Sequence, residues 1–199
     1  MYFEHLYSLW KPYKIPGKKQ KMKKKKKGTP EKEETLFWKT HFNIPEIIEI
    51  PEHVVHLNLK ESGITDDELL YIVKRIKKID MLDLHYTGIS NEGIKHLIKL
   101  DSFQELRLKG NTGIDNGCML YISQIKKLKF LHVRHTAVNV DGLKEILCLQ
   151  NLKTVLVSDN DTQENIDKKM KEITASIPLC EFCVNNTNYA PKQPQSIGS

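Results

Sequence analysis

Apolar residues recur along this chain in a fixed group of three, spaced as L-x-x-L-x-L, and the group returns every 24 or 25 residues. The first members of the five groups lie 25, 24, 25 and 24 residues apart. The groups are Val54, Leu57 and Leu59; Ile79, Leu82 and Leu84; Phe103, Leu106 and Leu108; Leu128, Leu131 and Val133; and Leu152, Val155 and Val157. Alternation at the end of each group is typical of a short strand with one buried face, so the pattern predicts five equivalent strands.

A polar turn and a second apolar stretch follow the first four groups. The turns include SGI at 62–64 and TGI at 87–89, and an Asp, Asn, Ser or Thr then precedes residues with helical spacing, as in SNEGI at 90–94. Side-chain oxygens of this kind cap the first turn of a helix, so each unit is predicted to run strand, turn, capped helix. One such unit cannot bury its apolar face alone, whereas five stacked units form a continuous core.

Two segments carry the complete pattern, MLDLHYTGISNEGIKHLIKL at 81–100 and FLHVRHTAVNVDGLKEILCL at 130–149. They resemble the leucine-rich repeat family, in the class whose units of 24–25 residues read roughly LxxLxLxxTxITDxGLxxLxxL. The resemblance covers about residues 54–183. It implies an α/β fold, a right-handed solenoid with a curved parallel sheet and helices on the convex side. It implies little about function, because this family is a scaffold for many unrelated partners.

The repeats and their flanks divide the chain into five parts. Residues 1–34 are expected to be a basic, disordered arm, because the run GKKQKMKKKKKGTP has almost nothing apolar to bury. Residues 35–53, with an aromatic cluster, are expected to form an N-terminal cap. Five repeat units are placed at 54–158, a C-terminal cap at 159–184, and a disordered tail at 185–199.

The excess of positive charge is concentrated at the N-terminal end of the chain. The chain has 31 Lys and Arg against 25 Asp and Glu, a net charge of +6, of which residues 1–53 contribute +5 through 12 Lys and 7 Glu. No apolar run approaches the roughly 18 residues of a membrane-spanning helix. Four scattered cysteines and the absence of a secretory signal favour the cytoplasm. A mitochondrial location is the alternative, because residues 5–30 contain no acid.

Residues that alternate with the inward-pointing leucines are expected to lie exposed on the opposite face of the sheet, in three columns. The predicted partner-binding residues are His56, Asn58, Lys60, Met81, Asp83, His85, Glu105, Arg107, Lys109, Phe130, His132 and Arg134, and the fifth strand adds Thr154, Leu156 and Ser158. The fixed charges of this set sum to +2. Arg and aromatic side chains are common anchors of interfaces, so the face suits an acidic or mixed protein partner.

The motifs of the common enzyme classes are absent from the sequence. It contains no glycine-rich phosphate loop, no G-x-S-x-G and no H-E-x-x-H, so no catalytic residue and no cofactor is predicted. Cys180 and Cys183 form a C-x-x-C pair, but on a strand residues three apart face opposite sides and cannot share a metal ion. Cys118 and Cys148 are expected to be small core residues on the helical side.

The histidines and one acidic turn are the remaining candidates for a metal site. His85 and His132 lie two strands apart, a backbone gap of about 10 Å that argues against a shared ion. His132 and His135 are also poorly aligned. The run Asp159–Asp161 resembles part of a calcium loop but lacks its Gly and distal Glu, so a solvated turn is favoured and no metal site is predicted.

The sequence therefore predicts a non-enzymatic, monomeric protein-interaction module that binds a protein partner on the outward sheet face. An alternative of a different class rests on the eight lysines within residues 18–27, which suit nucleic acid or another anionic surface. A third possibility is a looser resemblance to the short repeat proteins of mitochondrial respiratory-complex assembly, carried by LKTVLVSD at 152–159 and Ile177–Pro178.

Overall fold

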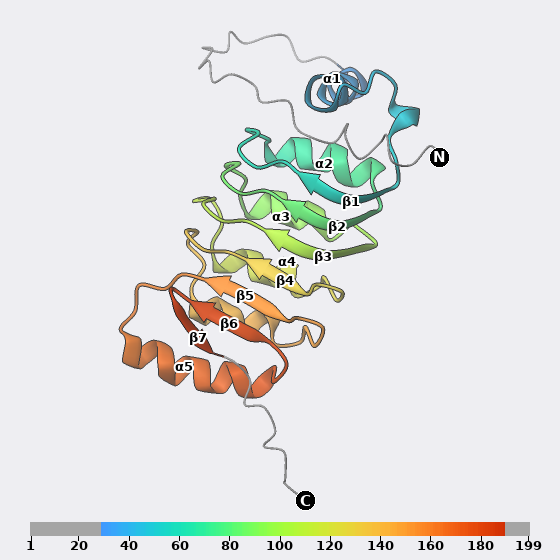
Figure 1. The fold of residues 1–199 in the computed structure, drawn as a ribbon. Coiled ribbons are helices and arrows are strands. Elements are labelled where there is room, and N and C mark those ends of the chain that lie inside the picture. The colour runs from blue at the N-terminus through green and yellow to red at the C-terminus, as the bar shows by residue number, and fades with distance from the viewer. Residues whose placement is uncertain (1–28, 190–199) are drawn as a thin grey trace, which may run out of the picture.

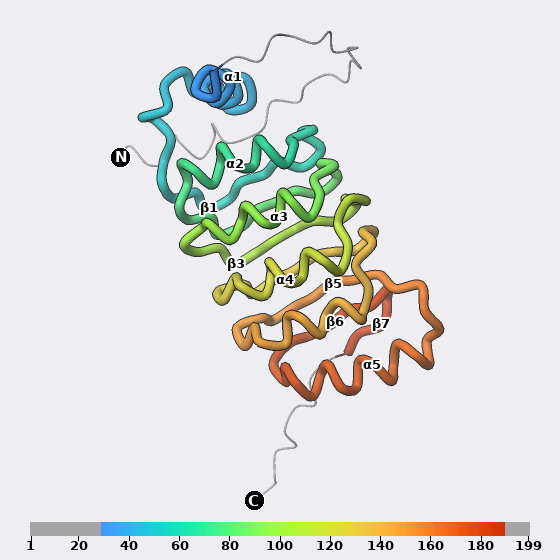
Figure 2. Tube along the Cα trace, turned by 180° about the vertical axis from the view of Figure 1, so that it is seen from behind, coloured from blue at the N-terminus to red at the C-terminus, as the bar shows by residue number. Residues whose placement is uncertain are grey.

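The computed structural model describes residues 29–189 of the chain, which form one seven-stranded sheet with helices along one of its faces (Figures 1 and 2). The strands are β1 (His53–Asn58), β2 (Lys78–Asp83), β3 (Ser102–Arg107), β4 (Phe130–His132), β5 (Thr154–Val157), β6 (Glu181–Val184) and β7 (Thr187–Tyr189). The helical elements are α1 (Pro30–Phe42), η1 (Ile47–Glu49), α2 (Asp66–Arg75), α3 (Asn91–Leu97), η2 (Asn116–Cys118), α4 (Met119–Ile122), η3 (Val140–Ile146) and α5 (Gln163–Ser176). The predicted α/β class is confirmed.

Strand order in the sheet follows the order of the chain. Strands β1 to β6 pair in parallel, each with the next, and β7 turns back antiparallel to β6. One row of paired residues is Leu57, Leu82, Leu106, Leu131, Val155 and Phe182. The fifteen residues of the predicted apolar groups are at most 6% exposed. The period of the sequence is therefore the spacing from one strand to its neighbour, and the apolar groups form the core between sheet and helices.

The polar residue predicted before each helix caps it. Thr65 forms a reciprocal capping box with Glu68 at the start of α2. Ser90, Asp115 and Asn139 each accept a hydrogen bond from a backbone N–H two residues further on. The third and fourth units differ from the prediction, because a 3-10 turn, η2, begins the helical segment of the third unit and 3-10 turns, η3, replace the α-helix of the fourth. A 3-10 turn rises about 2.0 Å per residue against 1.5 Å, so it covers the same distance with fewer residues.

Polar side chains also join successive units where the helical segments begin. At each junction a backbone N–H donates to a side chain of the unit before it. The pairs are Ser90 N to Asp66 Oδ1 at 2.9 Å, Asp115 N to Asn91 Oδ1 at 3.2 Å and Asn139 N to Asn116 Oδ1 at 3.0 Å. We call this series the junction ladder. Its period of 23 or 24 residues matches the repeat, so the same contact recurs from α2 to η3.

The boundary predicted for the N-terminal arm is wrong at its end. The helix α1 begins at Pro30, where the fixed backbone angle of proline suits the first helical turn. Glu34, placed in the disordered arm by the sequence, is 1% exposed and lies against Lys74 and Arg75 of α2. The rest of that arm, residues 1–28, lies outside the described residues. No described helix is long and apolar enough to cross a bilayer.

The boundary predicted for the C-terminal tail is also wrong over its first residues. Residues 187–189 form β7, which pairs with β6 in the range expected to be disordered. The hydroxyl of Tyr189 donates to Asp167 Oδ1 of α5 at 2.5 Å and accepts from Gln163. These contacts give the short strand a partner on its helical side. Residues 190–199, the remainder of the predicted tail, lie outside the described residues.

Candidate functional site

Among residues 29–189, no helix lies against one face of the sheet, and we call this face the open face (Figure 1). Strand alternation brings all the predicted partner-binding residues to this face, because their neighbours in sequence are the buried leucines. Only His56, Asn58 and Lys60 are exposed, and the other nine are half-buried. The expectation of fully exposed columns is therefore wrong for β2 to β4. Long side chains there lie across neighbouring strands and contact one another.

Two histidines from strands that are not adjacent meet near the centre of the open face. His85 Nε2 lies 3.2 Å from His132 Nδ1, and the rings meet edge to face with centroids 4.9 Å apart. The inference that the strand spacing keeps the two imidazoles apart is wrong, because both side chains extend over β3 toward each other. Two ring nitrogens alone are a poor metal site, and within residues 29–189 no cluster of three or more His, Cys, Asp or Glu fits a metal.

A carboxylate sets the arrangement of protons in this pair. Asp83 Oδ1 lies 3.3 Å from His85 Nδ1 and also accepts the backbone N–H of His85 at 3.0 Å. We therefore assign the proton of His85 to Nδ1, facing the carboxylate, so that His85 Nε2 accepts a hydrogen bond from His132 Nδ1. The other nitrogen of His132, Nε2, is then unprotonated, and it is buried without a hydrogen-bond partner.

The surroundings of the pair disfavour a positive charge on it. Burial, together with the smaller effects of the nearby His85, Arg134, Lys109 and Arg107, lowers the pKa of His132 to about 4. Burial also lowers the pKa of His85, against an opposing effect of Asp83. Both rings are therefore neutral at pH 7, and the cations around them favour this neutral form.

Arg107 is held flat on the sheet beside this pair. Its Nη2 donates to Glu105 Oε2 at 3.1 Å, and its guanidinium carbon lies 5.4 Å from the ring centroid of Phe130. The side chain keeps about a third of its surface exposed. A guanidinium stacked on an aromatic ring retains several donors in a fixed plane, which is an arrangement suited to a carboxylate.

Arg134 reaches in the opposite direction, across β5 to β6. Its Nη2 lies 2.8 Å from Cys183 Sγ. A depression of about 350 Å³ opens there, and its lining residues are Arg134, Thr154, Leu156, Glu181, Phe182, Cys183 and Asn188. The sequence prediction stopped at the fifth strand and missed Glu181, Cys183 and Asn188. Their signal was present in the alternation of Cys180–Val184, which continues the buried and exposed pattern for one more strand.

The cysteines divide into buried and accessible thiols. Cys180 is buried and Cys183 half-buried, so the two do face opposite sides of β6. Cys118 is buried as expected, but Cys148 is exposed, which corrects its assignment to the core. It follows Leu147 at the outer surface of its unit, where its Sγ lies 3.5 Å from Lys126 Nζ. Burial raises the pKa of both Cys118 and Cys180 to about 12, so these thiols stay protonated.

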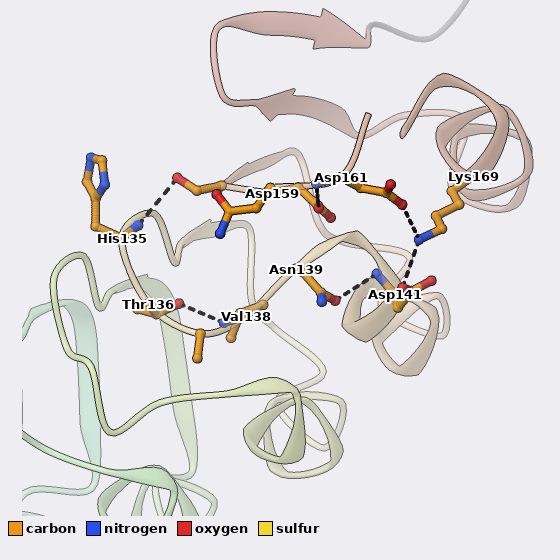
Figure 3. A pocket seen from close by; sticks show the side chains of 11 residues that line it. His135, Thr136, Val138, Asn139, Asp141, Asp159, Asp161 and Lys169 are labelled. Carbon is orange, nitrogen blue, oxygen red and sulfur yellow. Dashed lines mark hydrogen bonds and ion pairs between the residues drawn. The ribbon is translucent and has the colours of Figure 1, made fainter. Parts of the chain in front are cut away.

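A larger pocket, of about 630 Å³, lies between the loops that follow β4 and β5 and the helix α5 (Figure 3). Its carboxylates are occupied by the protein itself. Asp159 accepts from the backbone N–H groups of Val140 and Asp161, at 2.8 Å each. Lys169 Nζ bridges Asp141 at 2.8 Å and Asp161 at 3.1 Å. The turn predicted at 159–161 is exposed at Asn160 and Asp161, and its carboxylates also bond to the preceding unit and to α5.

The open face is therefore the better candidate for binding, because its cationic donors are only partly used. A scan against models of known protein families and a search of curated proteins found no match to this chain. The residues of the face itself must carry any functional conclusion.

Proposed function

We propose that this chain is a non-enzymatic protein-interaction module of the leucine-rich repeat type, and that its open face binds a protein partner of acidic character. The repeat assignment is supported by strands that pair in chain order at a spacing of 24 or 25 residues. In this proposal the sheet is the concave side of a right-handed solenoid and the helices are its convex side.

The observation that carries the proposal is the imbalance of charge on the open face. Two of the carboxylates there, Asp83 and Glu105, already contact His85 and Arg107, and a third, Glu181, lines the depression beside Arg134. Lys109 and Arg134 have no carboxylate within ion-pair distance among the described residues. A partner that supplies carboxylates would complete these pairs, and complementary charge speeds encounter and selects orientation.

The dimensions of the face favour a protein over a small molecule. Seven strands spaced about 4.8 Å apart make a surface roughly 29 Å long, comparable with one side of a standard protein interface. The depression beside Arg134 is shallow and holds about 350 Å³. Half-buried Phe130 and Arg107 near the middle of the sheet have the character of interface anchors.

A matched pair of triple variants tests this proposal. Partners captured from cell extract are identified by mass spectrometry, and the purified partner is then titrated against each variant. Arg107→Gln, Phe130→Ala and Arg134→Gln together remove two cations and one apolar side chain from the open face. Binding is expected to weaken at least a hundredfold, because central Arg and aromatic residues often contribute about 2 kcal/mol each.

The control removes the same chemistry from the helical side. Lys95→Gln, Leu120→Ala and Lys144→Gln change two exposed cations and one exposed apolar residue there. This variant is expected to bind as the wild type does. Equal binding by the open-face variant would refute the proposal.

The alternative, affinity supplied by the lysines at 18–27, is tested in the same titration. Those residues lie outside the described part of the chain, so the structure neither favours nor opposes it. Deletion of residues 11–28 removes the lysines and ends before Pro30, where α1 begins. The proposed function predicts retained binding at about 0.15 M salt, and the alternative predicts its loss.

A further inference from the structure

The His85–His132 pair is the most unusual feature of the open face, because it places a neutral, half-buried hydrogen-bonded pair among cations. The groups that face it are Lys60 after β1, Asp83 and Tyr86 at β2, Glu105, Arg107 and Lys109 at β3, and Arg134 at β4. Asp83 is the one carboxylate in contact with either ring among the described residues. The remaining acid, Glu105, pairs with Arg107.

We propose that a carboxylate of the acidic partner binds Arg107 beside His132, and that its binding brings one proton onto the His85–His132 pair. This subsite rests on the proposed function and names the chemistry that the partner must supply there. It also gives the interaction a measurable property, proton uptake on binding, that ordinary salt bridges to Arg and Lys do not have.

The position of the subsite follows from strand register. Arg107 and His132 are paired residues on adjacent strands, and Arg134 lies two residues beyond His132 on the same face. The guanidinium of Arg107 stacks on Phe130, which precedes His132 by two residues on that face. The side chain of Arg134 extends away from this point toward Cys183, so Arg107 is the arginine beside the imidazole of His132. A carboxylate that contacts the guanidinium of Arg107 lies close to the histidine pair.

The proton follows from the charge that the ligand adds. Without a ligand, burial and the cations around the pair keep it neutral at pH 7. An anion at close range favours the protonated form and raises the pKa toward the ordinary value of about 6.5. Since the complex then binds protons more tightly than the free protein, affinity rises as pH falls through this range. A metal ion at the same place would meet the repulsion that already opposes the proton.

The coupling between proton uptake and binding can be measured by calorimetry. The ligand is an acetylated, amidated peptide of five Asp-Ser repeats, titrated at pH 7.5, 6.5 and 5.5 and constant low ionic strength. The carboxylates of this peptide stay ionised throughout, because the ordinary pKa of Asp is about 3.9. The association constant is expected to rise about tenfold between pH 7.5 and 5.5 if the pKa of the pair returns to about 6.5 in the complex. Repeating the titration in buffers of different ionisation enthalpy counts the protons taken up.

Two variants separate the pair from the other histidines. His132→Gln is expected to bind the peptide with no rise in affinity at low pH and no proton uptake. His56→Gln changes an exposed histidine of the same face and is expected to keep both. In the wild type, the ring nitrogen resonances of His132 should move toward imidazolium when the peptide is added at pH 6, which reports the proton without any substitution.

Several results would overturn the inference. They are peptide binding that does not depend on pH, a rise that persists in His132→Gln, no peptide binding at any pH, and a ten-thymidine oligonucleotide that shows the signature in place of the peptide. The capture and triple-variant experiment decides the proposed function separately. If the open face binds its partner and the peptide shows no proton uptake, the subsite fails and the proposed function stands.

Discussion

The side chain of Asn111 is fully buried and satisfies the turns of two adjacent units. Its Oδ1 accepts from the backbone N–H groups of Thr87 and Gly88 at 3.0 and 2.8 Å, and from the hydroxyl of Thr87. Its Nδ2 donates to the carbonyls of Leu84 and Leu108 at 2.8 Å each. An amide is the side chain that offers an acceptor and two donors at once, so this position requires Asn.

Replacement of Asn111 by Ala should destabilise the protein by about 3–5 kcal/mol. The backbone N–H groups of Thr87 and Gly88 lose their partner, and the carbonyls of Leu84 and Leu108 each lose one of two hydrogen bonds. Each unsatisfied buried group costs about 1–3 kcal/mol, partly recovered where water enters. Urea denaturation followed by circular dichroism measures the change. Asn160→Ala, in an exposed turn, is the control and should stay within about 0.5 kcal/mol. A loss below about 1 kcal/mol for Asn111→Ala would show that the turns find other partners.

The buried residues of the repeat and the residues of the open face differ sharply in how well the sequence predicts their contacts. The buried positions of Leu57 or Leu106 follow from alternation and period, which depend only on neighbours in the chain. The contact between His85 and His132 does not, because it depends on rotamers and on the lean of two side chains over a third strand. The repeat therefore predicts which face a residue occupies. It does not predict which residues meet on that face.

At the scale of elements, α1 extends the helical layer beyond the repeats and packs against α2 (Figure 2). Phe37 and Trp38 bury its apolar side, with ring centroids 5.2 Å apart. Glu34 adds two ion pairs, to Lys74 Nζ at 2.5 Å and to Arg75 Nε at 2.6 Å. Sequence composition assigned Glu34 to the charged arm, because nothing local distinguishes a solvated Glu from one that meets cations 40 residues away.

The docking of α1 should weaken in acid. Burial raises the pKa of Glu34, but hydrogen bonds and charges from Arg75 and Lys74 outweigh it and hold the pKa below its usual 4.5. The carboxylate therefore stabilises the fold above about pH 4.5, and this contribution is lost as pH falls below that value. Fluorescence of Trp38 in a Trp10→Phe background measures the docking, with Trp38 the one remaining tryptophan.

Glu34→Gln tests the same contact at neutral pH. It should cost about 1–3 kcal/mol, the usual range for hydrogen bonds to a charged group, and should remove the acid dependence. The cost is moderate because Lys74 and Arg75 stay partly exposed and remain hydrated. Glu31→Gln on the same helix changes an exposed carboxylate and should leave both stability and acid response unchanged. An unaltered acid response in Glu34→Gln would assign it to another group.

At the scale of the whole molecule, the main contacts join each element to its neighbours in the stack. No strand of the described sheet pairs with one far away in sequence order. Stability is then the sum of local units and their interfaces, so the ends can open without the middle. The C-terminal end of the stack is expected to open more easily than the N-terminal end, because β7 is short and its first two residues are exposed.

Phe182→Ala should loosen this end selectively. Phe182 is 1% exposed and continues the row of leucines into β6, so its truncation should cost the final unit about 3–4 kcal/mol. Hydrogen exchange of α5, β6 and β7 should accelerate, while β1 to β3 keep their protection. Phe103→Ala, an equally buried phenylalanine in β3, should instead accelerate exchange in the middle of the sheet. Equal acceleration along the chain in both variants would mean that the stack unfolds as one unit.

The junction ladder has a direction. Each backbone N–H in it, at Ser90, Asp115 and Asn139, reaches back to a side chain about 24 residues nearer the N-terminus. During translation the acceptor therefore leaves the ribosome before its donor does. The units that begin at Ser90, Asp115 and Asn139 each meet, as they emerge, an acceptor side chain that has already left the ribosome. These three contacts can therefore form in the order in which the chain is made, one unit on the last.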